Sequence, residues 1–248
     1  MGLRRFTTAF LLCVVMSLLI AATAGSVSVN GGSDPLYVTG GFSPKQLSGR
    51  QASPIAVFLS GSVRNEPDSS LREVLVRIDR NVSLNGEAFP SCSRSRLMSK
   101  PQGCPGAIVG RGESEFALSS AGAEVLPLEI VNGATKTGQL RLYLVAAGEG
   151  VLSGQIVGEV TFRKAAQGRF GLQGLIWLPE QPNGAALRRF SLALNRIRSK
   201  GSVESVFSAS CRDGHLDSEV ARYALADGKS FEGPPLNRTC LSSSVASQ

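Results

Sequence analysis

The chain has 248 residues, of which 42% are hydrophobic and 18% charged, and 26 Lys and Arg residues stand against 19 Asp and Glu residues. This apolar content with a low charge per residue excludes a disordered chain, and the length fits one large β or α/β domain or two small ones. A single His excludes every metal site that needs two imidazoles from one chain.

The first 24 residues have the parts of a secretory signal peptide. Arg4 and Arg5 precede an apolar run over residues 6–20, and the small residues Ala22 and Ala24 follow it. We predict cleavage after Ala24, a secreted, extracellular protein, and no transmembrane segment in the mature chain. An uncleaved anchor is the alternative, although this run is marginal against the roughly 20 apolar residues that a bilayer requires. Without the two arginines, 24 basic and 19 acidic residues give a net charge of +5.

Residues 25–54 are rich in Gly, Ser and Pro, so we predict a leader or a loose first strand there. Residues 55–240 are predicted to form a β-sandwich domain, and residues 241–248 a disordered tail. Within the domain, short apolar runs separated by turn residues predict strands over 55–63, 74–82, 107–118, 125–131, 139–146, 155–163, 170–178, 189–197, 203–211 and 220–226.

Alternation and turn chemistry define the fold class. Val74, Val76 and Ile78 fall on one face of a strand. Asn-Gly or Asp-Gly dipeptides, which tolerate the positive φ of tight hairpins, begin at residues 85, 132, 183, 213 and 227. About ten strands without intervening long helices predict an all-β fold, an antiparallel β-sandwich or jelly roll.

Two segments have a helical alternative. Residues 93–99 could form one short helical turn. Residues 188–200 fit a basic amphipathic helix, because apolar residues recur there with helical spacing. The alternation of Phe190, Leu192 and Leu194 fits a strand equally well, and we favour the strand.

Four cysteines remain once Cys13 leaves with the signal peptide, namely Cys92, Cys104, Cys211 and Cys240. An even number in a secreted chain predicts two disulfides. Of the three pairings, nearness in sequence favours Cys92 with Cys104 and Cys211 with Cys240. A thiolate metal site would need paired C-x-x-C spacing, which the sequence lacks.

Short blocks around the cysteines carry a resemblance. The blocks are Phe89-Pro90-Ser91-Cys92, Cys104-Pro105-Gly106-Ala107, Ser208-Ala209-Ser210-Cys211 and Arg238-Thr239-Cys240. Over roughly Val74 to Cys240 the chain resembles secreted, β-rich, four-cysteine proteins of actinobacteria that have no known activity. The resemblance implies secretion and a shared disulfide-bonded fold, and it implies no active site.

Nucleophilic catalysis and calcium binding are weakly indicated in one loop. His215 lies between Asp213 and Asp217, but no serine has the flanking glycines of a nucleophile elbow, so we predict an exposed turn histidine. Asp213, Asp217 and Glu219 could bind a hard cation, but their spacing matches no EF-hand loop. We predict no catalytic residue, no metal and no cofactor.

Paired carboxylates would permit glycoside hydrolysis. Glu113 and Glu115 share one strand face, and Glu124, Glu129 and Glu159 lie on other predicted strands. Alternating glutamates are more often the solvated face of a strand, so this chemistry is an alternative.

A basic patch is formed in the sequence by Arg188, Arg189, Arg196, Arg198 and Lys200. It could bind an anionic cell-envelope polymer or surface, while the competing interpretation is a solvated strand edge that cations protect against pairing. Nucleic acid is not expected, because aromatic residues are only 6% of the chain. Trp177, which is flanked by aliphatic residues, is predicted to lie in the core.

These patterns predict a secreted extracellular or cell-envelope binding or structural module without catalytic activity. Two alternatives stay open. One is an extracellular polysaccharide hydrolase that uses two carboxylates. The other is a carrier of an apolar ligand, which needs a cavity instead of a core packed to native density.

Overall fold

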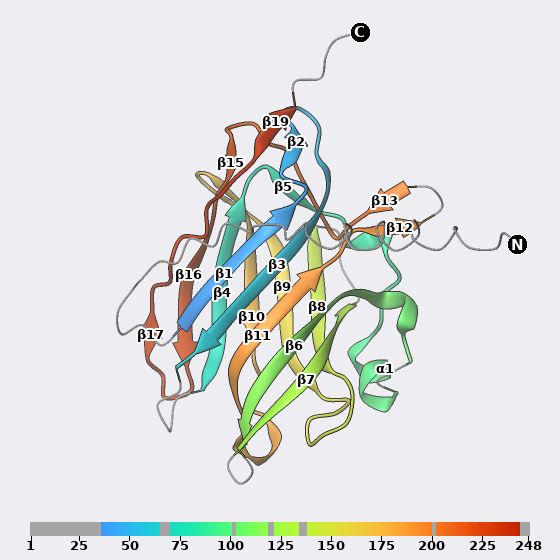
Figure 1. The fold of residues 1–248 in the computed structure, drawn as a ribbon, viewed down its shortest axis with the longest axis vertical. Helices are drawn as coiled ribbons and strands as arrows, with labels where there is room; N and C mark the ends of the chain where they lie inside the picture. The colour runs from blue at the N-terminus through green and yellow to red at the C-terminus, as the bar shows by residue number, and fades with distance from the viewer. Residues whose placement is uncertain are drawn as a thin grey trace, which may run out of the picture.

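The computed structural model describes residues 36–64, 70–100, 103–118, 122–133, 138–199 and 202–243 (Figure 1). The predicted signal peptide and its cleavage site after Ala24 lie outside these ranges. Thirteen strands form one sheet in which every pair is antiparallel. The antiparallel all-β fold with two disulfides is therefore confirmed.

In sheet order these strands are β17 (Ser230–Phe231), β16 (Ser218–Leu225), β4 (Leu71–Asp79), β10 (Phe170–Trp177), β9 (Ile156–Gln167), β8 (Gln139–Ala146), β7 (Gly122–Asn132), β6 (Ile108–Leu118), β11 (Ala186–Leu194), β3 (Ser53–Val63), β14 (Phe207–Ala209) and β5 (Val82–Leu84), with β1 (Leu36–Ser43) also paired to β3.

The sheet folds over between β7 and β8 and so forms two layers (Figure 1). We call β1, β3, β11, β6 and β7 the front layer, and β16, β4, β10, β9 and β8 the back layer. Period-two alternation turns the apolar side chains of both layers inward, where residues of β7, β8 and β9 pack in one cluster with residues of β1 and β3.

The remaining elements are short. They are α1 (Arg94–Ser99), the pair β2 (Gln46–Ser48) and β19 (Leu241–Ser243), the pair β12 (Ile197–Ser199) and β13 (Ser202–Glu204), the pair β15 (His215–Leu216) and β18 (Arg238–Thr239), and three 3-10 turns, Gly86–Ala88, Pro105–Ala107 and Pro182–Gly184. The helical turn predicted over 93–99 and the strand favoured from residue 188 are both present.

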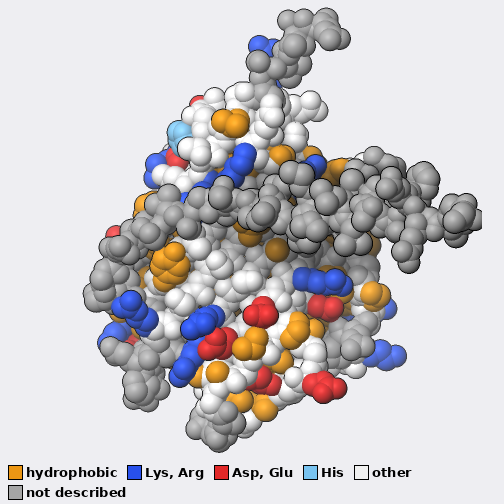
Figure 2. Space-filling view, viewed as in Figure 1, with side chains coloured by type: hydrophobic (Ala, Val, Ile, Leu, Met, Phe, Trp, Pro, Cys, Tyr) orange, Lys and Arg blue, Asp and Glu red, His pale blue; other side chains and the backbone are white. Residues whose placement is uncertain are grey.

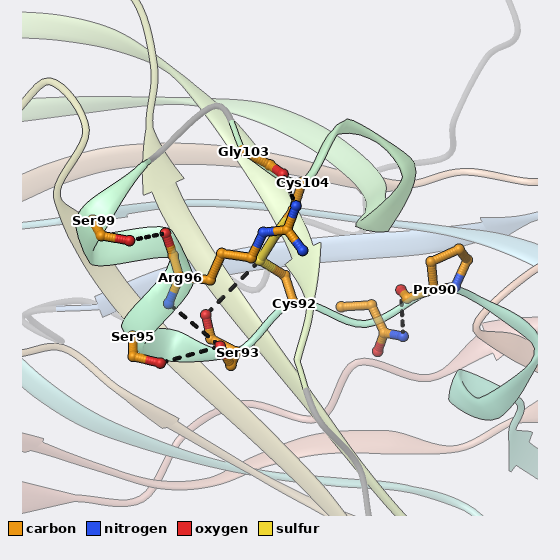
Figure 3. The surroundings of a disulfide bond; sticks show 9 residues. Pro90, Cys92, Ser93, Ser95, Arg96, Ser99, Gly103 and Cys104 are labelled. Carbon is orange, nitrogen blue, oxygen red and sulfur yellow. Dashed lines mark hydrogen bonds between the residues drawn. A yellow bond between two sulfur atoms is a disulfide. The ribbon is translucent and has the colours of Figure 1, made fainter.

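Both predicted disulfides form, Cys92 with Cys104 and Cys211 with Cys240. Figure 3 shows the first bond beside α1, where the Ser93 hydroxyl accepts a hydrogen bond from the Arg96 backbone N–H at 3.3 Å. This side-chain cap begins a helix that is too short to be stable alone.

Strands form at both ends of the described chain, in the segment predicted to be a leader or a loose first strand and in the predicted tail. Within residues 25–54, β1 pairs with β3 from Leu36 opposite Val63 to Ser43 opposite Ala56. Its inward residues Leu36, Val38 and Phe42 are buried. Few apolar residues suffice here because they alternate and the backbone is paired with a strong neighbour. In the predicted tail, residues 241–243 form β19, which runs parallel to β2.

Of the five Asn-Gly and Asp-Gly dipeptides, only the one at 227–228 connects two paired strands, β16 and β17. Gly184, Gly214 and Gly228 have the positive φ expected in tight turns. By contrast, Gly86 begins a 3-10 turn, and Gly133 forms a parallel bridge with Cys92.

Candidate functional site

An apolar cavity of about 180 Å³ lies between the two layers. Its walls include inward side chains from seven strands of the two layers. The front layer contributes Val57, Ile130, Leu192 and Leu194, and the back layer contributes Val76, Ile78, Leu142, Leu144, Val160, Phe162 and Ile176. The cavity therefore occupies space that the two apolar faces enclose but do not fill.

Aromatic rings border the cavity. Phe162 and Phe207 meet edge to face, with ring centroids 5.2 Å apart, and both line the wall. The Phe162 ring lies over Gly174, where an added Cβ would come within 2.5 Å of the ring. The absence of a side chain at this inward position of β10 thus sets where the Phe162 ring lies.

A second apolar cavity of about 50 Å³ adjoins the first. The two share wall residues from both layers, which are Leu59, Val76, Leu144, Ile176 and Leu192.

Three charged side chains at the rim of the larger cavity, Arg77, Asp217 and Glu219, form ion pairs within the protein. Arg77 Nη1 lies 2.9 Å from Glu219 Oε1. Asp217, which is 5% exposed, lies 3.3 Å from Arg169. These three charges have charged partners, whereas Arg238, which also lines the cavity, donates to uncharged oxygens on β1.

One seam beside the cavity is closed by side chains. Residues 233–236 hydrogen-bond along β16, with Leu236 N–H donating to Ser218 O at 2.6 Å. Arg238 then donates through Nε to the carbonyl of Gly40 and through Nη2 to the Thr39 hydroxyl, both on β1. Arg238 and Leu236 also line the cavity, so this seam joins the back layer to the edge of the front layer.

Lys45 lies next to the seam, with Nζ 4.2 Å from the centroid of the Phe42 ring. Burial, and secondly the charge of Arg238, lowers the pKa of the Lys45 ammonium below its ordinary value.

The predicted basic patch is spread over several elements. Arg188 and Arg189 lie on β11, and Arg196 is exposed in the connection that follows. Arg198 lies on β12, and Lys200 lies outside the described residues. For Arg188 and Arg189 the alternative of a protected strand edge is wrong, because β11 pairs with β3 on one side and β6 on the other. Arg198 differs, because β12 belongs to a two-stranded sheet with β13. Anion binding by these residues stays a prediction.

Glu113 and Glu115 lie on the outer face of the front layer, as alternation predicted. Figure 2 shows this face, on which acidic and basic side chains are interspersed. With Tyr37 and Arg189 they line an open hollow of about 430 Å³, in which Arg189 Nε lies 3.6 Å from Glu115 Oε2. Both carboxylates come from one strand, two residues apart, instead of from opposite walls.

The other three glutamates are separated in the fold. Glu124 accepts a hydrogen bond from the Val151 backbone N–H at 2.9 Å, and Glu129 lies opposite Val145 on β8. Glu159 is on the back layer, where it meets Arg94 and Arg141. Glu129, which is opposite Arg111 on β6, shares the outer face of the front layer with Glu113 and Glu115, whereas Glu124 and Glu159 lie elsewhere.

The loop acids do not converge on a cation. Asp213 faces Arg80 at 3.9 Å, while Asp217 and Glu219 have the arginine partners described above. Over the described ranges, no group of three or more His, Cys, Asp or Glu is arranged to hold a metal ion.

His215 does meet Asp217, with Nε2 3.5 Å from Oδ1, and its Nδ1 lies 2.9 Å from the carbonyl of Asp213. Both ring nitrogens face acceptor oxygens, so the ring as placed has no nitrogen directed at a nucleophile. The imidazole is exposed, as predicted, but His215 begins β15 and pairs with Thr239 on β18 instead of lying in a turn.

Trp177 was expected in the core but is 43% exposed. Alternation explains the difference, because Ile176 takes the inward position on β10 and Trp177 the outward one. Leu175, the next outward residue, is also exposed, at 38%. The aliphatic neighbours of Trp177 predicted burial because local composition does not distinguish the inward face of a strand from its outward face.

Within the described part of the chain, no helix has the length and apolar character needed to cross a membrane. No protein-family model matches the chain, and neither curated proteins nor solved structures give a match. The resemblance to secreted proteins of actinobacteria therefore stays a prediction.

Proposed function

We propose that the protein is a secreted binding module that holds a small, neutral, apolar molecule between its two layers. The observation that carries this proposal is the apolar cavity of about 180 Å³. An engineered protein cavity of about 150 Å³ with aliphatic and aromatic walls binds benzene or xenon. The predicted signal peptide and the two disulfides support secretion.

The composition of the walls supports an apolar ligand. A neutral apolar molecule gains dispersion contacts with the aliphatic and aromatic side chains that line the cavity, and it leaves no polar group of its own buried without a partner.

The walls and rim define the chemistry of the ligand. The cavity is below the roughly 300–1,000 Å³ of sites for larger ligands, so about six to ten non-hydrogen atoms fit. The matched charges of Arg77 with Glu219 and of Asp217 with Arg169 favour a neutral molecule. The adjoining smaller cavity favours a ring that carries a short alkyl chain.

The test is thermal unfolding in the presence of toluene, n-butylbenzene or phenol. At a ligand concentration of about 100 times Kd, binding to the native state adds about 2.7 kcal/mol, which raises the Tm by about 5–10 °C at this chain length. We expect toluene and n-butylbenzene to give this shift. Phenol should give less, because its hydroxyl would be buried without a partner.

Matched variants localise the binding. Val57→Phe places a ring inside the cavity and should remove the toluene shift, whereas Val125→Phe makes the same change at a position that is 56% exposed and should keep it. Leu194→Phe is a second filling variant if Val57→Phe is poorly folded. Absence of a shift with both hydrocarbons, or an equal shift in a folded filling variant, contradicts the proposal.

A further inference from the structure

Trp177, the only tryptophan of the chain, stands in a row of polar side chains on the outer face of the back layer. Its register partner on β4 is Glu73 and its partner on β9 is Glu159. Directly opposite residues of antiparallel strands have Cβ atoms about 4.5–5.5 Å apart. The indole is therefore flanked on both sides by a carboxylate.

Both carboxylates are fixed by arginines. Glu73 Oε1 lies 2.7 Å from Arg222 Nη2 on β16. Glu159 lies 3.2 Å from Arg141 on β8 and 3.5 Å from Arg94 at the start of α1. Because the Cys92–Cys104 bond encloses α1, the disulfide loop holds one of these arginines beside the row.

This arrangement offers one apolar stacking surface between two sets of hydrogen-bonding groups. An indole face packs against the C–H face of a sugar ring, and its polar tip tolerates a wet environment. Paired carboxylates and guanidinium groups accept from and donate to hydroxyls in fixed directions. We propose that this surface, made of Trp177, Leu175, Glu73, Arg222, Glu159 and Arg141, binds neutral oligosaccharides.

The charges favour a neutral sugar over an anionic surface. Each arginine of the row is matched by a carboxylate within 3.5 Å, so a lipid headgroup or acidic polymer would have to displace Glu73 or Glu159. Hydroxyl groups can instead add to these ion pairs without breaking them. This surface lies outside the cavity, so the inference is independent of the proposed function.

The test uses the intrinsic fluorescence of the full mature protein, which reports on Trp177 alone. The titrants are cellohexaose, chitohexaose, xylohexaose and maltohexaose, with phosphatidylglycerol vesicles as the competing probe. We expect a saturable change in emission with at least one hexasaccharide and none with vesicles. Emission that no hexasaccharide changes, or that only vesicles change, contradicts the proposal.

Calorimetric titration with the responding hexasaccharide then measures the role of the ring. Trp177→Ala should weaken binding at least about tenfold, and Trp177→Phe should restore part of the affinity. Tyr37→Ala is the matched control, because Tyr37 is an exposed aromatic residue of the front layer, at 41%. Unchanged affinity in Trp177→Ala, or an equal loss in Tyr37→Ala, overturns the assignment. A far-UV circular dichroism spectrum and a cooperative thermal unfolding transition like those of the parent protein show that Trp177→Ala is folded.

Discussion

A single buried amide organises the segment that precedes the first disulfide. Asn132 is fully buried, and its Nδ2 group donates to the carbonyls of Gly86, Phe89 and Pro90 at 3.1–3.2 Å. The backbone carbonyl of Asn132 accepts a hydrogen bond from the Cys92 backbone N–H at 2.8 Å. The Asn-Gly dipeptide at this position predicted a hairpin turn. The prediction missed the role of the Asn132 side chain, because a local sequence pattern cannot reveal partners more than forty residues away.

At the residue scale, Asn132→Ala should lower the free energy of unfolding by about 1–3 kcal/mol, because buried carbonyls lose their donor. Asn132→Asp should cost more, since a carboxylate would face the same carbonyl oxygens. Urea unfolding measures both, and Asn195→Asp, at an exposed position, should change stability by less than about 0.5 kcal/mol. A smaller loss for Asn132→Asp than for Asn132→Ala contradicts this role.

At the element scale, the strands were predictable where apolar residues alternate between clear turns. The run 139–146 coincides with β8. The run 189–197 covers most of β11 and reaches β12, because Asn195 and Arg196 separate the two. For the segment that contains β1 the sequence predicts either a leader or a loose first strand, because glycines such as Gly40 and Gly41 dilute its apolar composition. Those two glycines line the cavity, so the same feature that hid the strand contributes to the candidate site.

The seam between β1 and residues 233–238 depends on Arg238. Arg238→Ala removes the donors to Gly40 O and Thr39 Oγ1, which should speed amide exchange in β1 about tenfold or more. Exchange in β8, which pairs on both sides, should not change. Native-state hydrogen exchange followed by mass spectrometry resolves both strands. Equal protection of the β1 amides in the variant and the parent protein would contradict the prediction that the Arg238 hydrogen bonds stabilise this seam.

At the scale of the whole molecule, the sequence predicted the antiparallel fold and both disulfides, but it left a cavity between the layers only as one of two alternatives. Inward and outward faces follow from alternation within each strand, which is local. The volume left between layers depends on how side chains such as Val57, Leu142 and Phe162, far apart in sequence, meet across the core. The exposed position of Trp177 was missed for a related reason, since its face depends on the register of β10.

The most direct test of the account is the electron density of xenon in pressurised crystals of the mature protein, because xenon occupies dry apolar cavities without needing a hydrogen-bond partner. The account predicts a xenon peak between the layers, in contact with Val57, Ile130 and Leu142. A core without xenon, or the same volume filled by hydrogen-bonded water, would contradict an apolar binding cavity.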